Sequence, residues 1–143
     1  MNTYTTNSYG RTILIHLSKG EKVLESVQAE IERLGVKNGI LVSAIGSLRK
    51  ATIHVISTTE DYPTDVFFTV EKPIELGVAQ GLIIDGVPHF HLVISEPDGE
   101  VYVGHMEPGC EVQYLAELAI LELNDLSLMR KPDEFGVSHL LEK

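Results

Sequence analysis

Four dense apolar stretches constrain the fold more than any other feature of the chain. They lie at residues 39–48, 51–57, 65–70 and 74–84 and are rich in Val and Ile. Such composition favours strands over helices. Only short segments with Gly, Pro, Asp and Lys separate them, and no further helix is available for crossovers, so we expect antiparallel connections.

One helix is predicted, at about residues 20–34. Its apolar side chains recur at helical spacing, and Gly35 suits the position just beyond its end. Before it, Ser18 and Glu21 have the spacing of a capping box. In that motif the Ser18 hydroxyl accepts a hydrogen bond from the Glu21 backbone N–H, and the Glu21 carboxylate accepts one from the Ser18 backbone N–H. The apolar residues are Leu24, Val27, Ile31 and Leu34.

Residues 112–123 (VQYLAELAILEL) can be read in two ways. Their Ala, Glu and Leu content suits a helix, whereas their apolar density suits a buried strand. With 143 residues, the chain is long enough for one domain with its own core. We therefore predict a single α+β domain, a largely antiparallel sheet with one main helix. The dense apolar strands fit burial on both faces, which points to oligomerisation.

The charge of the chain argues against several classes of partner. It has 21 acidic and 11 basic residues, a net charge of −10. Such a surface repels phosphates, so direct nucleic-acid binding is disfavoured. No apolar run approaches the roughly 18 residues that a membrane helix needs, and the N-terminus does not resemble a signal peptide. With a single cysteine, these features favour a cytoplasmic protein.

Residues 88–106 contain three of the six histidines. Two strand-like runs, 88–96 and 100–106, are joined by Pro97-Asp98-Gly99. This tripeptide suits a three-residue hairpin loop, because Pro presets the first position and Gly takes the left-handed third. The loop fixes the register, and His91 then lies opposite His105.

The hairpin predicts a metal site. His89 shares the face of His91 because alternate strand residues point to the same side, and its partner in this register is Glu107. Three histidines with an open fourth position are the arrangement of catalytic zinc. We predict a divalent transition metal, zinc first, at His89, His91 and His105. Glu107 and Glu117 are accessory candidates, the latter orienting a histidine.

A shorter loop would remove this site. If Asp98 and Gly99 alone formed a type I′ turn, His91 would face Met106 and His105 would point to the other side. The histidines would then be structural. The position of Pro97 favours the longer loop.

The other chemically reactive side chains have simpler interpretations. Cys110 could ligate metal, but a small buried residue is the favoured interpretation. His54 is expected to be a packed or edge histidine. His16 and His139 have no partner that the sequence suggests.

Six segments bring a known family into view: KGE at 19–21, AIGSL at 44–48, IELGVAQGLI at 74–83, PHFHLVIS at 88–95, GHM at 104–106 and PGC at 108–110. Together the chain, from about residue 10 to 141, resembles the plants-and-prokaryotes-conserved (PPC) domain. The resemblance implies an α+β homotrimer and a strand at 112–123. The fold also looks similar to acetolactate decarboxylases, which hold zinc with three histidines; this is an analogy of fold.

Plant relatives carry AT-hook motifs, and stand-alone prokaryotic members are often labelled DNA-binding by analogy. This chain has no AT-hook, and His16 stands where many relatives have Arg. Three hypotheses follow. The preferred one is a metal-binding, homotrimeric interaction or regulatory module. The alternatives are a metal-dependent lyase or hydrolase acting on a small acid, and a DNA-associated regulator.

Overall fold

The computed structural model describes residues 1–143 and contains nine strands and one helix. In chain order they are β1 (Tyr9–Ser18), α1 (Val23–Leu34), β2 (Gly39–Ile56), β3 (Asp65–Val70), β4 (Ile74–Ile84), β5 (Val87–Ser95), β6 (Val101–Met106), β7 (Glu111–Leu123), β8 (Leu128–Pro132) and β9 (Ser138–Glu142). The predicted α+β class, mostly antiparallel sheet with one main helix, is confirmed.

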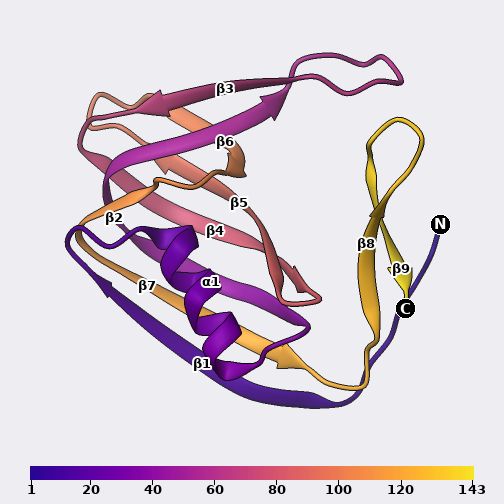
Figure 1. Cartoon of the computed structure of the whole chain (residues 1–143). Helices are drawn as coiled ribbons and strands as arrows, with labels where there is room; N and C mark the ends of the chain where they lie inside the picture. Colours follow the sequence, from indigo (N-terminus) through magenta and orange to yellow (C-terminus); the bar gives the residue numbers. More distant parts are fainter.

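Strand β2 organises the sheet. The two apolar stretches predicted at 39–48 and 51–57 are one continuous strand of 18 residues. Its first part pairs with β4 and β7, and its second part pairs with β3 and β6. The main sheet runs β1-β7-β2-β4-β5-β6, and the additional β2–β6 pairing curls it back on itself (Figure 1). This pairing brings β6 beside a strand some fifty residues earlier in the chain.

The ambiguous segment at 112–123 is a strand, as the family resemblance implied. It forms most of β7, lies between β1 and β2, and turns Ala116, Leu118 and Ile120 into the core. Partners on both sides satisfy its backbone groups, and its apolar density fills the core. Tertiary pairing therefore overrides the helical propensity of Ala, Glu and Leu.

Helix α1 starts later than predicted, at Val23 instead of about residue 20. The Glu21 carboxylate accepts the Ser18 backbone N–H, as a capping box requires. However, the Glu21 N–H donates to the Ser18 carbonyl and not to its hydroxyl, and the N-cap residue Lys22 makes no side-chain cap. These residues form a turn tied to β7, where the Gly20 N–H donates to Val112. The predicted end is confirmed, since Gly35 is left-handed.

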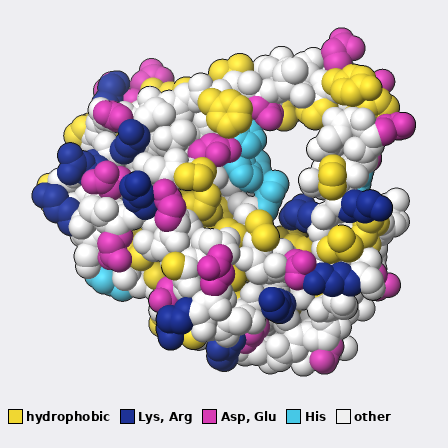
Figure 2. Space-filling view, in the orientation of Figure 1, with side chains coloured by type: hydrophobic (Ala, Val, Ile, Leu, Met, Phe, Trp, Pro, Cys, Tyr) yellow, Lys and Arg dark blue, Asp and Glu magenta, His cyan; other side chains and the backbone are white.

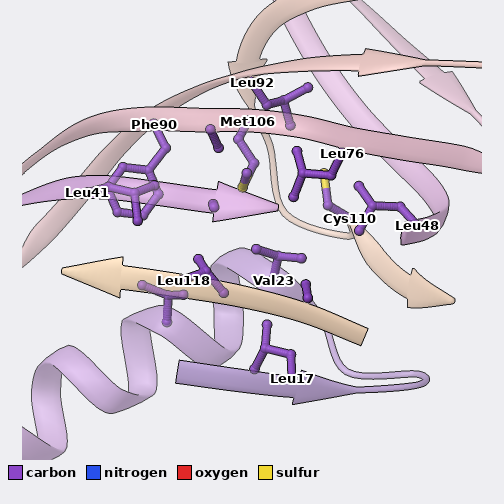
Figure 3. Packing of buried hydrophobic residues seen from close by; sticks show 14 of the residues in the cluster. Leu17, Val23, Leu41, Leu48, Leu76, Phe90, Leu92, Met106, Cys110 and Leu118 are labelled. Atoms are coloured by element: carbon purple, nitrogen blue, oxygen red, sulfur yellow. The ribbon is translucent and has the colours of Figure 1, made fainter. Parts of the chain in front are cut away.

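The core lies between the helix and the inner face of the sheet. Val23, Val27 and Ile31 are the buried residues of α1. They belong to one cluster of 25 buried residues, which come from α1, strands β1 to β7 and two connecting segments. Figure 3 shows Phe90 and Met106 among them. Because alternate strand residues point to opposite faces, the residues between these core positions on β5 and β6 face outward.

The outer face of the sheet is apolar in several places. Large side chains are exposed there on β1, β2, β3 and β6, for example Leu14, Val42, Phe67 and Val103. One antiparallel sheet face is often solvated, but such a face is normally polar. Within one chain nothing covers these residues.

The C-terminal residues form a second hairpin. Strands β8 and β9 pair only with each other, and β8 contacts β4. In Figure 1 this hairpin stands apart from α1, at the opposite side of the sheet. No helix in the structure has the length and apolar character required to cross a membrane.

Candidate metal centre

The histidine hairpin has the predicted register. His91 is the partner of His105 across β5 and β6. The Glu96 N–H donates to the Glu100 carbonyl at 2.9 Å, and Gly99 has a φ of 94°. These features define the three-residue loop and exclude the two-residue alternative. The prediction that the hairpin brings the histidines together is confirmed.

Three imidazoles converge on the outer face of the sheet. The ring centroid of His105 lies 4.6 Å from that of His89 and 5.3 Å from that of His91. One ring nitrogen of each histidine lies within 4.8 Å of the others. Tetrahedral zinc would place its ligands roughly 3.4 Å apart. Small side-chain rotations would close that difference, so the donor set fits one transition-metal ion.

Two glycines allow the strands to approach closely enough for this convergence. A Cβ at Gly104 would lie 2.6 Å from the His54 carbonyl of β2, nearer than any side chain tolerates. Gly81, with a φ of 152°, faces the His89 carbonyl of β5 in the same way. Each glycine thus lets a histidine-bearing strand lie against its neighbour. Both belong to the segments that carried the family resemblance.

The predicted partner of His89 is wrong. The β5–β6 pairing ends at His91 and His105 and does not continue to His89 and Glu107. On its other edge, toward β4, His89 lies opposite Leu82. Glu107 nevertheless reaches the cluster by another route. Its Oε1 lies 2.6 Å from Nδ1 of His54, and this pair is less than one-quarter exposed.

His54 is the site residue that sequence reasoning missed. It lies opposite His105 in the β2–β6 pairing, and the two rings stack with centroids 4.5 Å apart. His54, His105 and Glu107 form a second group whose ligand atoms lie within 4.8 Å of one another. No local pattern in the sequence signals this neighbour, because the two strands are far apart in the chain.

The other candidates lie outside the cluster. Glu117 of β7 lies opposite His16 of β1, with 3.4 Å between Oε1 and Nδ1, and both side chains are more than half exposed. The structure does not bring Glu117 to the metal candidates. Cys110 is fully buried and its thiol contacts Thr52 backbone atoms. His139 lies 2.8 Å from Asp133 in the second hairpin.

The environment favours neutral imidazoles, the form that binds metal. Burial lowers the pKa of His105 to about 4, and the neighbouring histidines act in the same direction while Glu107 opposes them. Burial also lowers the pKa of His91, followed by the charge of His54. For His89 burial is again the first cause of a lowered pKa, and Arg130 is the second. By contrast, burial raises the pKa of the Cys110 thiol to about 11, which disfavours the thiolate.

His89 and His91 open onto a cavity of about 670 Å³. Strands β2, β4 and β5 form one side of it, and Arg130 of β8 contributes to the other. Figure 2 shows histidine side chains at the edge of an opening in the molecule, with Lys or Arg side chains beside it. A metal held here would therefore have an open side.

A larger hollow, about 860 Å³, lies elsewhere, around residues of β2, β4 and β7. Its charges are largely paired with each other. Lys50 contacts Glu71 and Lys72 contacts Glu96, at 2.8 and 2.6 Å. It contains no histidine. The histidine cavity is the better candidate, because only there do several metal-ligating side chains converge without ion-pair partners.

The fold and site define a small α+β domain with a histidine cluster on the outer face of its sheet. Residues 4–124 match the family described as the Plants and Prokaryotes Conserved (PCC) domain. The chain belongs to this family, as its sequence motifs indicated. The match includes the whole histidine cluster and ends before β8.

Solved structures with similar folds cover nearly the whole chain. A metal-containing protein from Archaeoglobus fulgidus is 26% identical, with a TM-score of 0.86, over 99% of this chain and 100% of that one. A plant- and prokaryote-conserved (PPC) protein from Pyrococcus horikoshii is 26% identical, with a TM-score of 0.80, over 98% and 99%.

A curated relative is much longer. The Bifunctional protein GlmU of Synechococcus sp. (strain JA-3-3Ab) is 28% identical over 123 residues, which are 86% of this chain and 19% of that protein. The chain thus spans about one-fifth of the length of this relative.

Proposed function

We propose that this protein binds a divalent transition metal ion, with zinc as the first expectation, through His89, His91 and His105. The observation that carries the proposal is the convergence of three imidazoles, two of them half-buried and that of His91 exposed, beside an open cavity. Clustered imidazoles repel one another when they are protonated. When they are neutral, their ring nitrogens can instead bind one shared metal ion. The metal-containing protein from Archaeoglobus fulgidus, which has the same fold, supports this assignment.

The proposed role is that of an interaction or regulatory module assembled as a homotrimer. The exposed apolar side chains of the outer face support self-association, since they would otherwise remain in water. Light scattering on the purified protein is expected to give three times the mass of one chain. A monomer at micromolar concentration would contradict the trimer. We also propose a cytoplasmic location, which the free buried thiol of Cys110 supports.

Metal content per chain, measured by mass spectrometry on tag-free protein, tests the central assignment. The natural protein is expected to hold about one metal ion per three-histidine site, and His105→Ala is expected to lose it. His139→Ala is the matched control, because that imidazole lies in the separate β8–β9 hairpin and pairs with Asp133. Absence of metal from the natural protein, after growth with added zinc, would make the histidines structural.

A second candidate function is a metal-dependent lyase or hydrolase reaction on a small acid. The specific observation that favours it is the His54–Glu107 pair beside His105. A carboxylate that fixes the orientation of an imidazole is a common arrangement for proton transfer. A panel of small carboxylic acids, followed by proton NMR with the zinc-loaded protein, tests it. Turnover that His54→Ala abolishes, while metal content stays unchanged, is the supporting result.

A further inference from the structure

Arg130 has no partner within the chain. The other three arginines each contact a glutamate: Arg11 contacts Glu122, Arg33 contacts Glu30 and Arg49 contacts Glu111. Arg130 makes no ion pair and no side-chain hydrogen bond, and its Nε is buried without any acceptor. In a chain with 21 acidic residues, a half-buried guanidinium without a carboxylate is unexpected.

The location of Arg130 suggests what its missing partner could be. Arg130 belongs to β8, which contacts β4 and otherwise pairs only with β9. The hairpin thus holds a guanidinium at the cavity that His89 and His91 also line. The guanidinium of Arg130 and the proposed metal ligands His89 and His91, which come from separate sheets, therefore line the same cavity. An anion placed there could contact both.

We infer that Arg130 binds the carboxylate of a small organic acid whose second oxygen group reaches the metal held by His89, His91 and His105. This inference rests on the proposed metal site and names the class of ligand that the site takes. A guanidinium presents two parallel N–H groups that match the two oxygens of a carboxylate. Arg130 lines the cavity and has no ion-pair partner, so a ligand carboxylate there would give its guanidinium an acceptor.

A carboxylate suits the cavity better than a phosphate does. Phosphate sites typically add several backbone N–H groups, often at the start of a helix. The only helix, α1, contributes no residue to this cavity. Arg130 is the only Lys or Arg side chain that lines the cavity. The remaining wall is partly apolar, with Ile40, Val42 and Leu82, and Gln80 is also there. A short acid with an apolar body fits these surroundings.

The experiment uses the full-length protein loaded with Co²⁺, whose visible absorption reports a ligand entering the metal coordination sphere. Malonate is the probe, titrated at constant ionic strength into the natural protein, Arg130→Gln, Arg130→Lys and Lys131→Gln. Lys131→Gln is the matched control. It removes one positive charge from the neighbouring residue, which is exposed and does not line the cavity. Metal content and circular dichroism are measured for each variant.

We expect malonate to change the cobalt spectrum of the natural protein and of Lys131→Gln with equal affinity. Arg130→Gln should weaken malonate binding at least tenfold while metal content stays constant. Arg130→Lys should retain part of the affinity, because it keeps the charge without the planar pair of donors. If Arg130→Gln perturbs the fold, loss of affinity in a folded Arg130→Lys supplies the decisive comparison.

Other outcomes would overturn the inference. Equal malonate affinity in all variants, with metal bound, would make Arg130 a structural residue and leave the metal site standing. Equal weakening in Arg130→Gln and Lys131→Gln would reduce the effect to net charge. Inorganic phosphate binding as tightly as malonate would replace the carboxylate site by a general anion site. Failure of the natural protein to bind cobalt or zinc would instead refute the proposed function.

Discussion

The two hairpins at the histidine cavity differ in how they are held. The β5–β6 hairpin is part of the main sheet and buries Phe90, Leu92, Ile94 and Met106 in the core. The β8–β9 hairpin forms a separate sheet in which only Leu128 is buried. The β5–β6 hairpin thus holds its histidines on the well-packed main sheet. The β8–β9 hairpin holds Arg130 on a small separate sheet that few contacts stabilise. Isolated two-stranded hairpins are only marginally stable in water.

This difference separates the two chemical parts of the site. The family match covers residues 4–124 and includes every histidine of the cluster but not β8 or β9. The proposed metal-binding face thus belongs to the part of the chain that matches the family. The proposed carboxylate contact comes from outside that part. A scaffold of this kind could keep its metal site while a less constrained hairpin varies what binds beside it.

The largest expected effect is on the core of the first hairpin. Phe90→Ala should lower the free energy of unfolding by about 3–5 kcal/mol, because it leaves a cavity among fully buried side chains. Leu140→Ala, in β9 and only half-buried, should cost about 1 kcal/mol or less. Urea unfolding followed by circular dichroism measures both. Similar costs for the two would contradict the difference between the hairpins.

Acidity should affect the two hairpins at different pH. The folded-state pKa of His105 is about 4, below its ordinary value of 6.5, so the unfolded chain binds more protons between these values. The metal-free protein should therefore lose stability as pH falls from 6.5 towards 4. Because the ring is partly exposed and solvent screens its charge, the loss from this group should be on the order of 1 kcal/mol, below the full value of the shift. In the second hairpin, the hydrogen bond from His139 lowers the pKa of Asp133 from 3.8, so that contribution is lost at lower pH.

Unfolding in urea at several pH values, with a chelator present, measures this dependence. His105→Asn should flatten the curve between pH 6.5 and 4, whereas Asp133→Asn should leave that range unchanged. An unchanged slope in His105→Asn would show that other groups cause the acid sensitivity.

Removing the carboxylate beside the cluster should have a moderate effect on metal affinity. Glu107→Gln removes a negative charge close to His105, from the carboxylate that contacts His54, and should weaken zinc binding by roughly tenfold. Glu117→Gln is the matched control, since Glu117 contacts only the exposed His16. Competition with a chromophoric zinc chelator gives both affinities. Equal effects would remove Glu107 from the site.

The smallest expected effect concerns DNA. A mobility-shift assay at low salt should show no tight binding to duplex DNA, because the net charge of −10 opposes contact with the phosphate backbone. The second hairpin does not change this expectation, since its cations Arg130 and Lys131 are accompanied by the acidic residues Asp133, Glu134 and Glu142. Tight binding under these conditions would revive the hypothesis of a DNA-associated regulator.

The features that short-range geometry controls follow from the sequence alone. The Pro97-Asp98-Gly99 loop fixed the pairing of His91 with His105, and Gly35 marked the end of the helix. Both depend on backbone conformations that a few neighbouring residues impose. Strand alternation then placed His89 on the same face as His91. The net charge also followed directly from the sequence.

Which distant residues join these histidines depends on long-range strand pairing. His54 reached the cluster because β2 is long enough to pair with β6, and Glu107 came with it. Arg130 arrived on a hairpin whose position depends on its contact with β4. Such pairings are chosen by the packing of the whole sheet and core, so no local pattern around residue 54 or 130 could reveal them.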